Sequence, residues 1–182
     1  MTHRKKSCRG QTVIEFTLVG IPMIFVLIST FEMARGMWLY TTLAAAIKDG
    51  ARFAIVHGHD CAIPPNSCAV QIRDVANRIA NYGVGLIPAD IRNVTFRTST
   101  RTITCPTLRD CLQAGALGDT YWPSGAPGAQ PPDPGGVRRM ALEIRGQYPF
   151  QSAIAMFWPG AGPGMNFGTF LLGASSRESI QY

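Results

Sequence analysis

Charged side chains are scarce in this chain, and the motifs of catalysis are absent. Charged residues make up 15% of the 182 residues and hydrophobic residues 46%, a balance more apolar than that of a typical cytosolic protein. No serine, cysteine or carboxylate pair stands in a recognisable nucleophile or acid–base motif. The glycine-rich stretch 159–164 lacks the Gly-Lys-Ser/Thr ending of a phosphate-binding loop, so we expect a plain loop there. We therefore expect neither enzymatic activity nor a cofactor.

Charges are also missing from an apolar run near the N-terminus. No charged residue occurs from Phe16 to Phe31, which is close to the minimum length that a helix needs to cross a bilayer. Glu15 stands directly before this run, although a carboxylate placed in a membrane is costly. An acidic residue kept at the edge of such a span indicates a functional site. We expect Glu15 to pair with a charge on a neighbouring subunit.

The first ten residues form a basic leader. The leader contains no acid and four basic residues: Arg4, Lys5, Lys6 and Arg9. Removing residues 1–10 therefore lowers the formal net charge from +6 to +2. A mature chain at +2, with its arginines scattered, gives no reason to expect a nucleic-acid partner. Basic residues beside a membrane span stay in the cytoplasm, so we expect the residues after the span to lie on the opposite side of the membrane.

The residues around the end of this leader carry a family resemblance. Gly10 is followed by Gln11, and the pair Glu15-Phe16 begins five residues after the glycine. This order resembles the prepilin-peptidase site of the type IV pilin superfamily. More narrowly, residues 10–58 resemble the TadE-like pseudopilins, minor pilins of tight-adherence (Flp-type) pili. Residues 60–136 show no resemblance to this family. The resemblance rests on further residues along the chain: Pro22, Glu32, Ala44-Ala45-Ala46, Gly50-Ala51-Arg52-Phe53-Ala54, Tyr148-Pro149-Phe150 and Ala174-Ser175-Ser176-Arg177-Glu178.

The resemblance implies a processed and assembled subunit. A prepilin peptidase would cut between Gly10 and Gln11, and Glu15 with Phe16 would serve assembly, the glutamate neutralising the amine of an incoming subunit. The implied partners are the peptidase, other pilin or pseudopilin subunits, the inner-membrane assembly platform and membrane lipid. The implied place is the bacterial inner membrane, with the extracellular pilus as a further location, and the implied roles are pilus biogenesis, surface adhesion and biofilm formation.

Other interpretations of the N-terminus stay open. The anchor could remain uncleaved. Alternatively, an ordinary signal peptidase could cut near Ala34 or Gly36, which weakly resemble the small residues of a signal-peptidase site. The protein could also be a repeating major pilin, although such subunits are typically very short. A different class of function is a single-pass inner-membrane protein whose periplasmic head senses or binds a ligand.

The sequence predicts an α+β protein in three parts: a leader (1–10), a long helix (11–57) and a periplasmic head (58–182). The helix has its membrane span at about 14–37, and Trp38 and Tyr40 stand where interfacial aromatic residues belong. Pro22 is expected to kink the helix or loosen one turn. After Tyr40 the apolar residues recur at spacings of three and four, which predicts an amphipathic helix packed on the head: Leu43, Ala46, Ile47, Ala51, Ala54 and Ile55.

The head is predicted to contain an antiparallel sheet with short helices. Helical spacing covers 69–82, and a shorter helix is expected at 107–116. Alternation predicts a strand or hairpin at 91–104 with its turn near Ser99-Thr100. Two further strands, 137–148 and 167–180, are expected to run antiparallel to each other. The stretch 123–136 is rich in proline and glycine and predicts an exposed loop.

Four cysteines remain after the leader with Cys8 is removed. Cys61, Cys68, Cys105 and Cys111 lie in the part predicted to be periplasmic, where disulfides persist. Proximity favours the pairs 61–68 and 105–111, while crossed pairing and a four-thiolate zinc site stay open, although zinc sites commonly use closer spacing. We expect disulfides and no metal.

Two other segments allow more than one interpretation. His57, His59 and Asp60 could surround a metal ion, but such a cluster beside a loop is more commonly polar surface. The apolar run 153–158 is either a buried core segment or a patch that contacts a partner subunit or the membrane.

Overall fold

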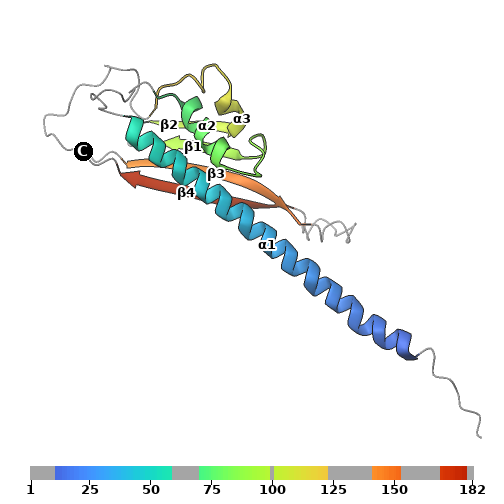
Figure 1. Ribbon diagram of the computed structural model, residues 1–182. Coiled ribbons are helices and arrows are strands. Elements are labelled where there is room, and N and C mark those ends of the chain that lie inside the picture. Colours follow the sequence, from blue (N-terminus) through green and yellow to red (C-terminus); the bar gives the residue numbers. More distant parts are fainter. Residues whose placement is uncertain (1–10, 59–69, 99–100, 123–140, 153–168, 180–182) are drawn as a thin grey trace, which may run out of the picture. The chain divides into compact units, whose positions relative to one another are not determined.

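The computed structural model describes residues 11–58, 70–98, 101–122, 141–152 and 169–179 (Figure 1). The chain divides into two compact units, residues 1–36 with 152–168 and residues 37–151 with 169–182. We call the second unit the head. The expected features that lie outside the described residues include the leader at 1–10, the turn near Ser99-Thr100, the loop at 123–136, the apolar run at 153–158 and the glycine-rich stretch at 159–164.

The first helix, α1, comprises Gln11–Gly58 and continues through Pro22. Its residues from Met37 onward belong to the head, where one face is buried. Of the six apolar positions predicted to pack on the head, Ile55 is partly buried. The other five are buried: Leu43, Ala46, Ile47, Ala51 and Ala54. Lys48 and Arg52, on the other side of the helix, are exposed. The predicted amphipathic half of α1 is therefore confirmed.

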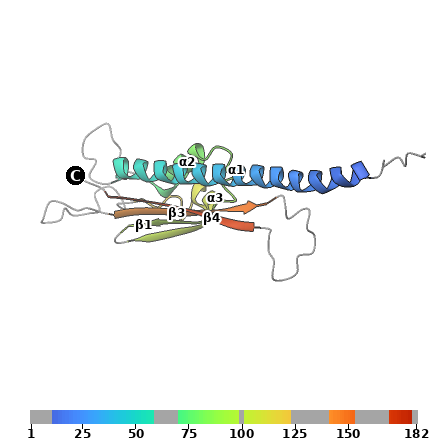
Figure 2. The ribbon, with the colours of Figure 1, turned by 90° about the horizontal axis from the view of Figure 1, so that it is seen from below.

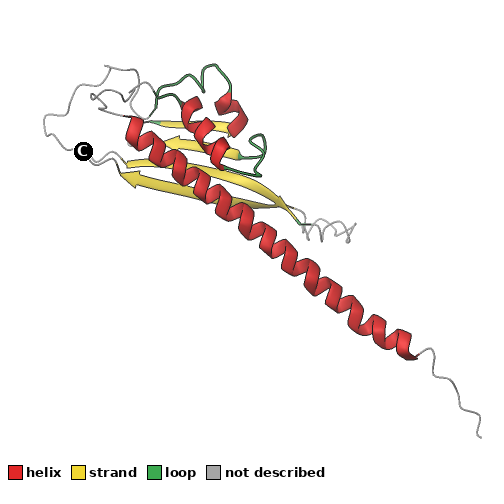
Figure 3. Ribbon diagram, viewed as in Figure 1, coloured by secondary structure: helices red, strands yellow, loops and turns green. Residues whose placement is uncertain are grey.

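Two shorter helices follow α1 in the described part of the head (Figure 3). Helix α2 comprises Ile72–Tyr82, and Asp74 accepts a hydrogen bond of 2.9 Å from the backbone N–H of Gln71 at its start. Helix α3 comprises Leu108–Leu112. Helix α2 approaches α1 closely at Gly50, where a Cβ atom would lie 2.5 Å from Cγ1 of Ile79. A glycine is needed at this position because any side chain would push the two helices apart.

The four strands form one antiparallel sheet in the order β2-β1-β3-β4. Strands β1 (Arg92–Arg97) and β2 (Thr102–Thr107) form the predicted hairpin. Strands β3 (Ala141–Gln151) and β4 (Thr169–Ser179) pair along their whole length, from Ala141 with Ser179 to Gln151 with Thr169. The pairing of β1 with β3 joins the two hairpins, and its register shifts between Arg92 and Thr95.

The helices cover one face of this sheet. Figure 2 shows α2 and the second half of α1 on the same side of the strands. Buried residues alternate with exposed or half-buried ones along β1, β2 and most of β3, as expected for a sheet with one covered face. The buried residues include Val94, Phe96, Ile103, Leu142 and Ile144, and they join the apolar face of α1 in one core. The predicted α+β class, with a long N-terminal helix and an antiparallel sheet, is confirmed.

Candidate functional site

The first part of α1 has an apolar surface that the described chain does not bury. The large apolar side chains from Val13 to Leu27 are all exposed: Val13, Ile14, Phe16, Leu18, Val19, Ile21, Met23, Ile24, Phe25, Val26 and Leu27. Covering one such side chain is worth about 1.5–3 kcal/mol, so a helix with this surface is stable in lipid or against other apolar helices and poorly suited to water. The helix is long and apolar enough to cross a membrane, which fits a single-pass membrane protein.

The hydroxyl groups within this segment bond to the helix itself. Thr17 donates to the carbonyl oxygen of Val13 at 3.0 Å, and Thr30 donates to that of Val26 at 2.8 Å. Ser29 does the same with Phe25 at 2.8 Å. Polar groups inside hydrocarbon must find partners within the protein, and these three have them without a second chain.

Glu15 is the one acidic residue in this segment before Glu32. It lies on the exposed surface of α1, about 6 Å along the helix axis from Gln11 at the helical rise of 1.5 Å per residue. Phe16 beside it is 77% exposed, the highest value among the large apolar side chains described. Gln11 is the first residue of α1, and Gly10 lies outside the described residues.

The far end of the apolar segment carries the features of a membrane boundary. Arg35 and Glu32 form an ion pair at 3.5 Å, as their i, i+3 spacing predicts. Trp38 and Tyr40 are both about half exposed. The indole ring of Trp38 lies against Gly85, where a Cβ atom would be 2.9 Å from Cη2 and where φ is +84°. Gly85 therefore meets two demands that a larger residue does not, space for the ring and a left-handed backbone.

The comparison with protein families bears on this same segment. Residues 10–52 match the model of one family, described as TadE-like protein. Over these residues the chain is similar to that family. The match confirms the resemblance seen in the sequence, and it covers Glu15, the apolar run and most of the amphipathic half of α1. No curated protein and no solved structure matches the chain.

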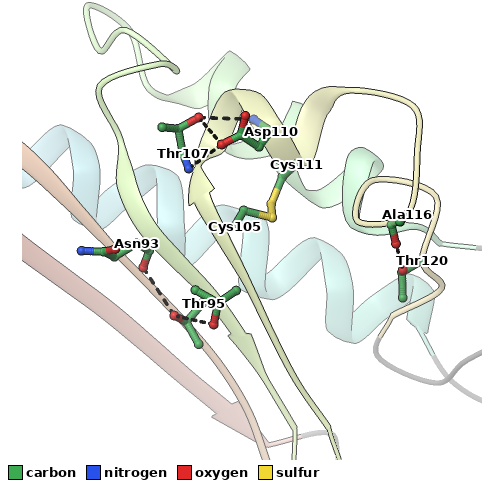
Figure 4. The surroundings of a disulfide bond; sticks show 9 residues. Asn93, Thr95, Cys105, Thr107, Asp110, Cys111, Ala116 and Thr120 are labelled. Carbon is green, nitrogen blue, oxygen red and sulfur yellow. Dashed lines mark hydrogen bonds between the residues drawn. A yellow bond between two sulfur atoms is a disulfide. The ribbon is translucent and has the colours of Figure 1, made fainter.

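The head carries a disulfide between Cys105 and Cys111 (Figure 4). This is one of the two pairings that proximity favours, and its Cα atoms lie 5.9 Å apart. The bond ties the end of β2 to α3. Thr107 is the N-cap residue just before α3, and its N–H and hydroxyl both donate to Asp110 at 2.9 Å. Cys61 and Cys68 lie outside the described residues, so their pairing stays a prediction.

His57 has neighbours of its own at the end of α1. Its ring stacks on Phe53 with centroids 4.4 Å apart, and its Nδ1 atom lies 3.0 Å from the carbonyl oxygen of Phe53. His59 and Asp60, the other two members of the possible metal cluster, lie outside the described residues. Within the ranges that the structure describes, no group of three His, Cys, Asp or Glu side chains could hold a metal ion.

Proposed function

We propose that this protein is a minor pilin, or pseudopilin, of a tight-adherence type IV pilus. The observation that carries the proposal is an apolar helix whose large apolar side chains from Val13 to Leu27 are exposed, with one carboxylate, Glu15, at its beginning. The TadE-like match over residues 10–52 supports the same assignment. Such a subunit inserts in the bacterial inner membrane, leaves residues 1–10 in the cytoplasm and holds its head in the periplasm.

Processing and assembly follow from the order of residues. A prepilin peptidase cuts after Gly10 and frees the amine of Gln11. In the assembled bundle the carboxylate of Glu15 pairs with the free amine of a neighbouring subunit. An unpaired charge in hydrocarbon is costly, so the paired arrangement is favoured over misregistered ones. The exposed apolar side chains of α1 then exchange contacts with lipid for contacts with other subunit helices and with the assembly platform. The filament in turn supports surface adhesion and biofilm formation.

The test is the substitution Glu15→Leu in cells that make the pilus. We expect normal insertion and cleavage but a loss of assembled filaments of at least about tenfold, because a missing ion pair worth about 1.4 kcal/mol already changes an equilibrium by that factor. Sheared filaments are quantified by immunoblotting of the supernatant. Thr17→Val is the matched control, since it removes a polar group that bonds only to its own helix.

Two outcomes would count against the proposal. Normal filament yield with Glu15→Leu would remove Glu15 from the assembly mechanism. If the wild-type protein stays in the inner membrane when pili are sheared off, the single-pass sensor or ligand-binding protein becomes the better assignment.

A further inference from the structure

The face of the sheet that the described helices leave open carries a row of side chains that reaches across all four described strands. The register pairs Arg97 of β1 with Thr102 of β2 on one side and with Glu143 of β3 on the other. Glu143 in turn pairs with Arg177 of β4. Since Phe96, Leu142 and Ile144 next to them are buried in the core, this row lies on the face opposite the helices.

The row lines a cleft of about 430 Å³, a size within the range of ligand sites. Four of its lining side chains are arginines and one is an acid: Arg97, Arg101, Arg145, Arg177 and Glu143. The acid is held by one arginine, with Oε1 of Glu143 2.7 Å from Nε of Arg145. Among the described residues, Arg97, Arg101 and Arg177 form no ion pair. The cleft therefore has an excess of three positive charges.

The backbone beneath these charges is well fixed. Thr98 is 4% exposed, and its N–H donates to the carbonyl oxygen of Arg101 at 2.7 Å. The N–H of Arg101 donates back to the hydroxyl of Thr98 at 3.1 Å. Strand pairing fixes the backbone positions of the other three arginines. All four guanidinium groups are therefore attached to backbone that is already ordered before a ligand binds. Such preorganisation raises affinity, and guanidinium forks match carboxylate and phosphate groups.

We propose that this cleft binds an anionic saccharide, one that carries carboxylate or phosphate groups. Guanidinium groups would bind the anions, and the hydroxyl of Thr102, on the same face, suits a sugar hydroxyl. An acidic peptide fits less well, because peptides that bind sheets use backbone hydrogen bonds at an edge, while β1 and β3 are interior strands. A nucleic acid fits less well too, since no aromatic side chain stands among the described lining residues to stack on a base. The site belongs to the head and does not depend on pilus assembly.

The experiment measures binding to the full chain in a neutral detergent. The probes are tetragalacturonate, its fully methyl-esterified neutral form, and hexaglutamate, each titrated in low salt by microscale thermophoresis. We expect tetragalacturonate to bind and the neutral ester not to bind. The double variant Arg97→Gln with Arg177→Gln should lower the affinity by at least about tenfold, the scale expected for losing charge-assisted contacts. Glu143→Gln should raise the affinity, because it removes the negative charge from the cleft.

The matched control is Arg92→Gln with Arg109→Gln, which removes the same charge from exposed positions outside the cleft. It should change the affinity less than twofold, and thermal unfolding of each variant shows whether the head still folds. The proposal is overturned if tetragalacturonate does not bind or if the neutral ester binds as tightly. An equal loss in the control variant would reduce the effect to general charge attraction and overturn it as well. Tighter binding of hexaglutamate would assign the cleft to an acidic peptide instead.

Discussion

Removing the disulfide between Cys105 and Cys111 should destabilise the head by an amount that the structure allows to be calculated. The two cysteines are six positions apart, so the bond closes a loop of about seven residues. In the chain-entropy model such a loop is worth about 2 kcal/mol. Both cysteines are fully buried, and replacing each with alanine removes a buried group about the size of a methylene, at about 0.8 kcal/mol each. The variant Cys105→Ala with Cys111→Ala should therefore lose roughly 4 kcal/mol in total.

A loss of this size lowers the unfolding midpoint of a domain this large by roughly 10–15 °C. The assay is thermal unfolding of the full chain in detergent, followed by near-ultraviolet circular dichroism, with a thiol count on denatured protein as a check. Cys8→Ala serves as the control and should leave the midpoint unchanged, because Cys8 lies in the leader. A fall of less than about 3 °C would refute the calculation, and five free thiols in the denatured wild-type full chain would remove its premise.

Two further substitutions test the packing of the head. Gly50→Leu should destabilise the head by about 1–3 kcal/mol or more, because the new side chain meets Ile79. Gly20→Ala in the same helix should be tolerated, because a Cβ atom there would lie 3.8 Å from the ring of Phe16. Equal effects of the two substitutions would contradict this account of the α1–α2 contact. Thr107→Ala removes the hydroxyl that accepts from the N–H of Asp110 and should cost about 1 kcal/mol in denaturant unfolding; an unchanged midpoint would show that this cap contributes nothing.

The helices were predictable because their signals are local. Spacings of three and four residues predict the buried side of α1, and the same spacing predicts α2, which begins at Ile72 rather than at 69. The strand or hairpin predicted at 91–104 is the pair β1 and β2, which ends three residues later at Thr107, and the last strand, predicted at 167–180, is Thr169–Ser179. The start of α2 was less certain because residues 59–69 carry loop residues and two cysteines without a period.

The end of β3 shows where local signals stop. Alternation predicts a strand at 137–148, which ends at Tyr148. In the structure β3 continues through Pro149 to Gln151. The pairing of β1 with β3 ends at Gln147, so beyond this point no described strand pairs with that side of β3, where a proline, which has no N–H to donate, is tolerated. The order of strands, which decides this, depends on pairing between residues far apart in the sequence.

The arginine cleft was missed for the same reason. The sequence shows Arg97, Arg101, Arg145 and Arg177 as scattered residues in a chain of low net charge. The pairing of β1 with β3 and of β3 with β4 brings them to one face. A register shift between Arg92 and Thr95, where Asn93 has a φ of 51°, helps to set which side chains face which side. Glu15, in contrast, was visible from the sequence because its significance lies in its neighbours along the chain.

The most direct test of the central proposal is the intact mass of the protein extracted from membranes of cells that have the prepilin peptidase. The proposal requires a mature chain that begins at Gln11, with residues 1–10 removed, and retention of the full-length precursor when Gly10 is replaced by a bulky residue. A mature mass that corresponds to a start at Met1 or Thr2, or after Ala34 or Gly36, would contradict it.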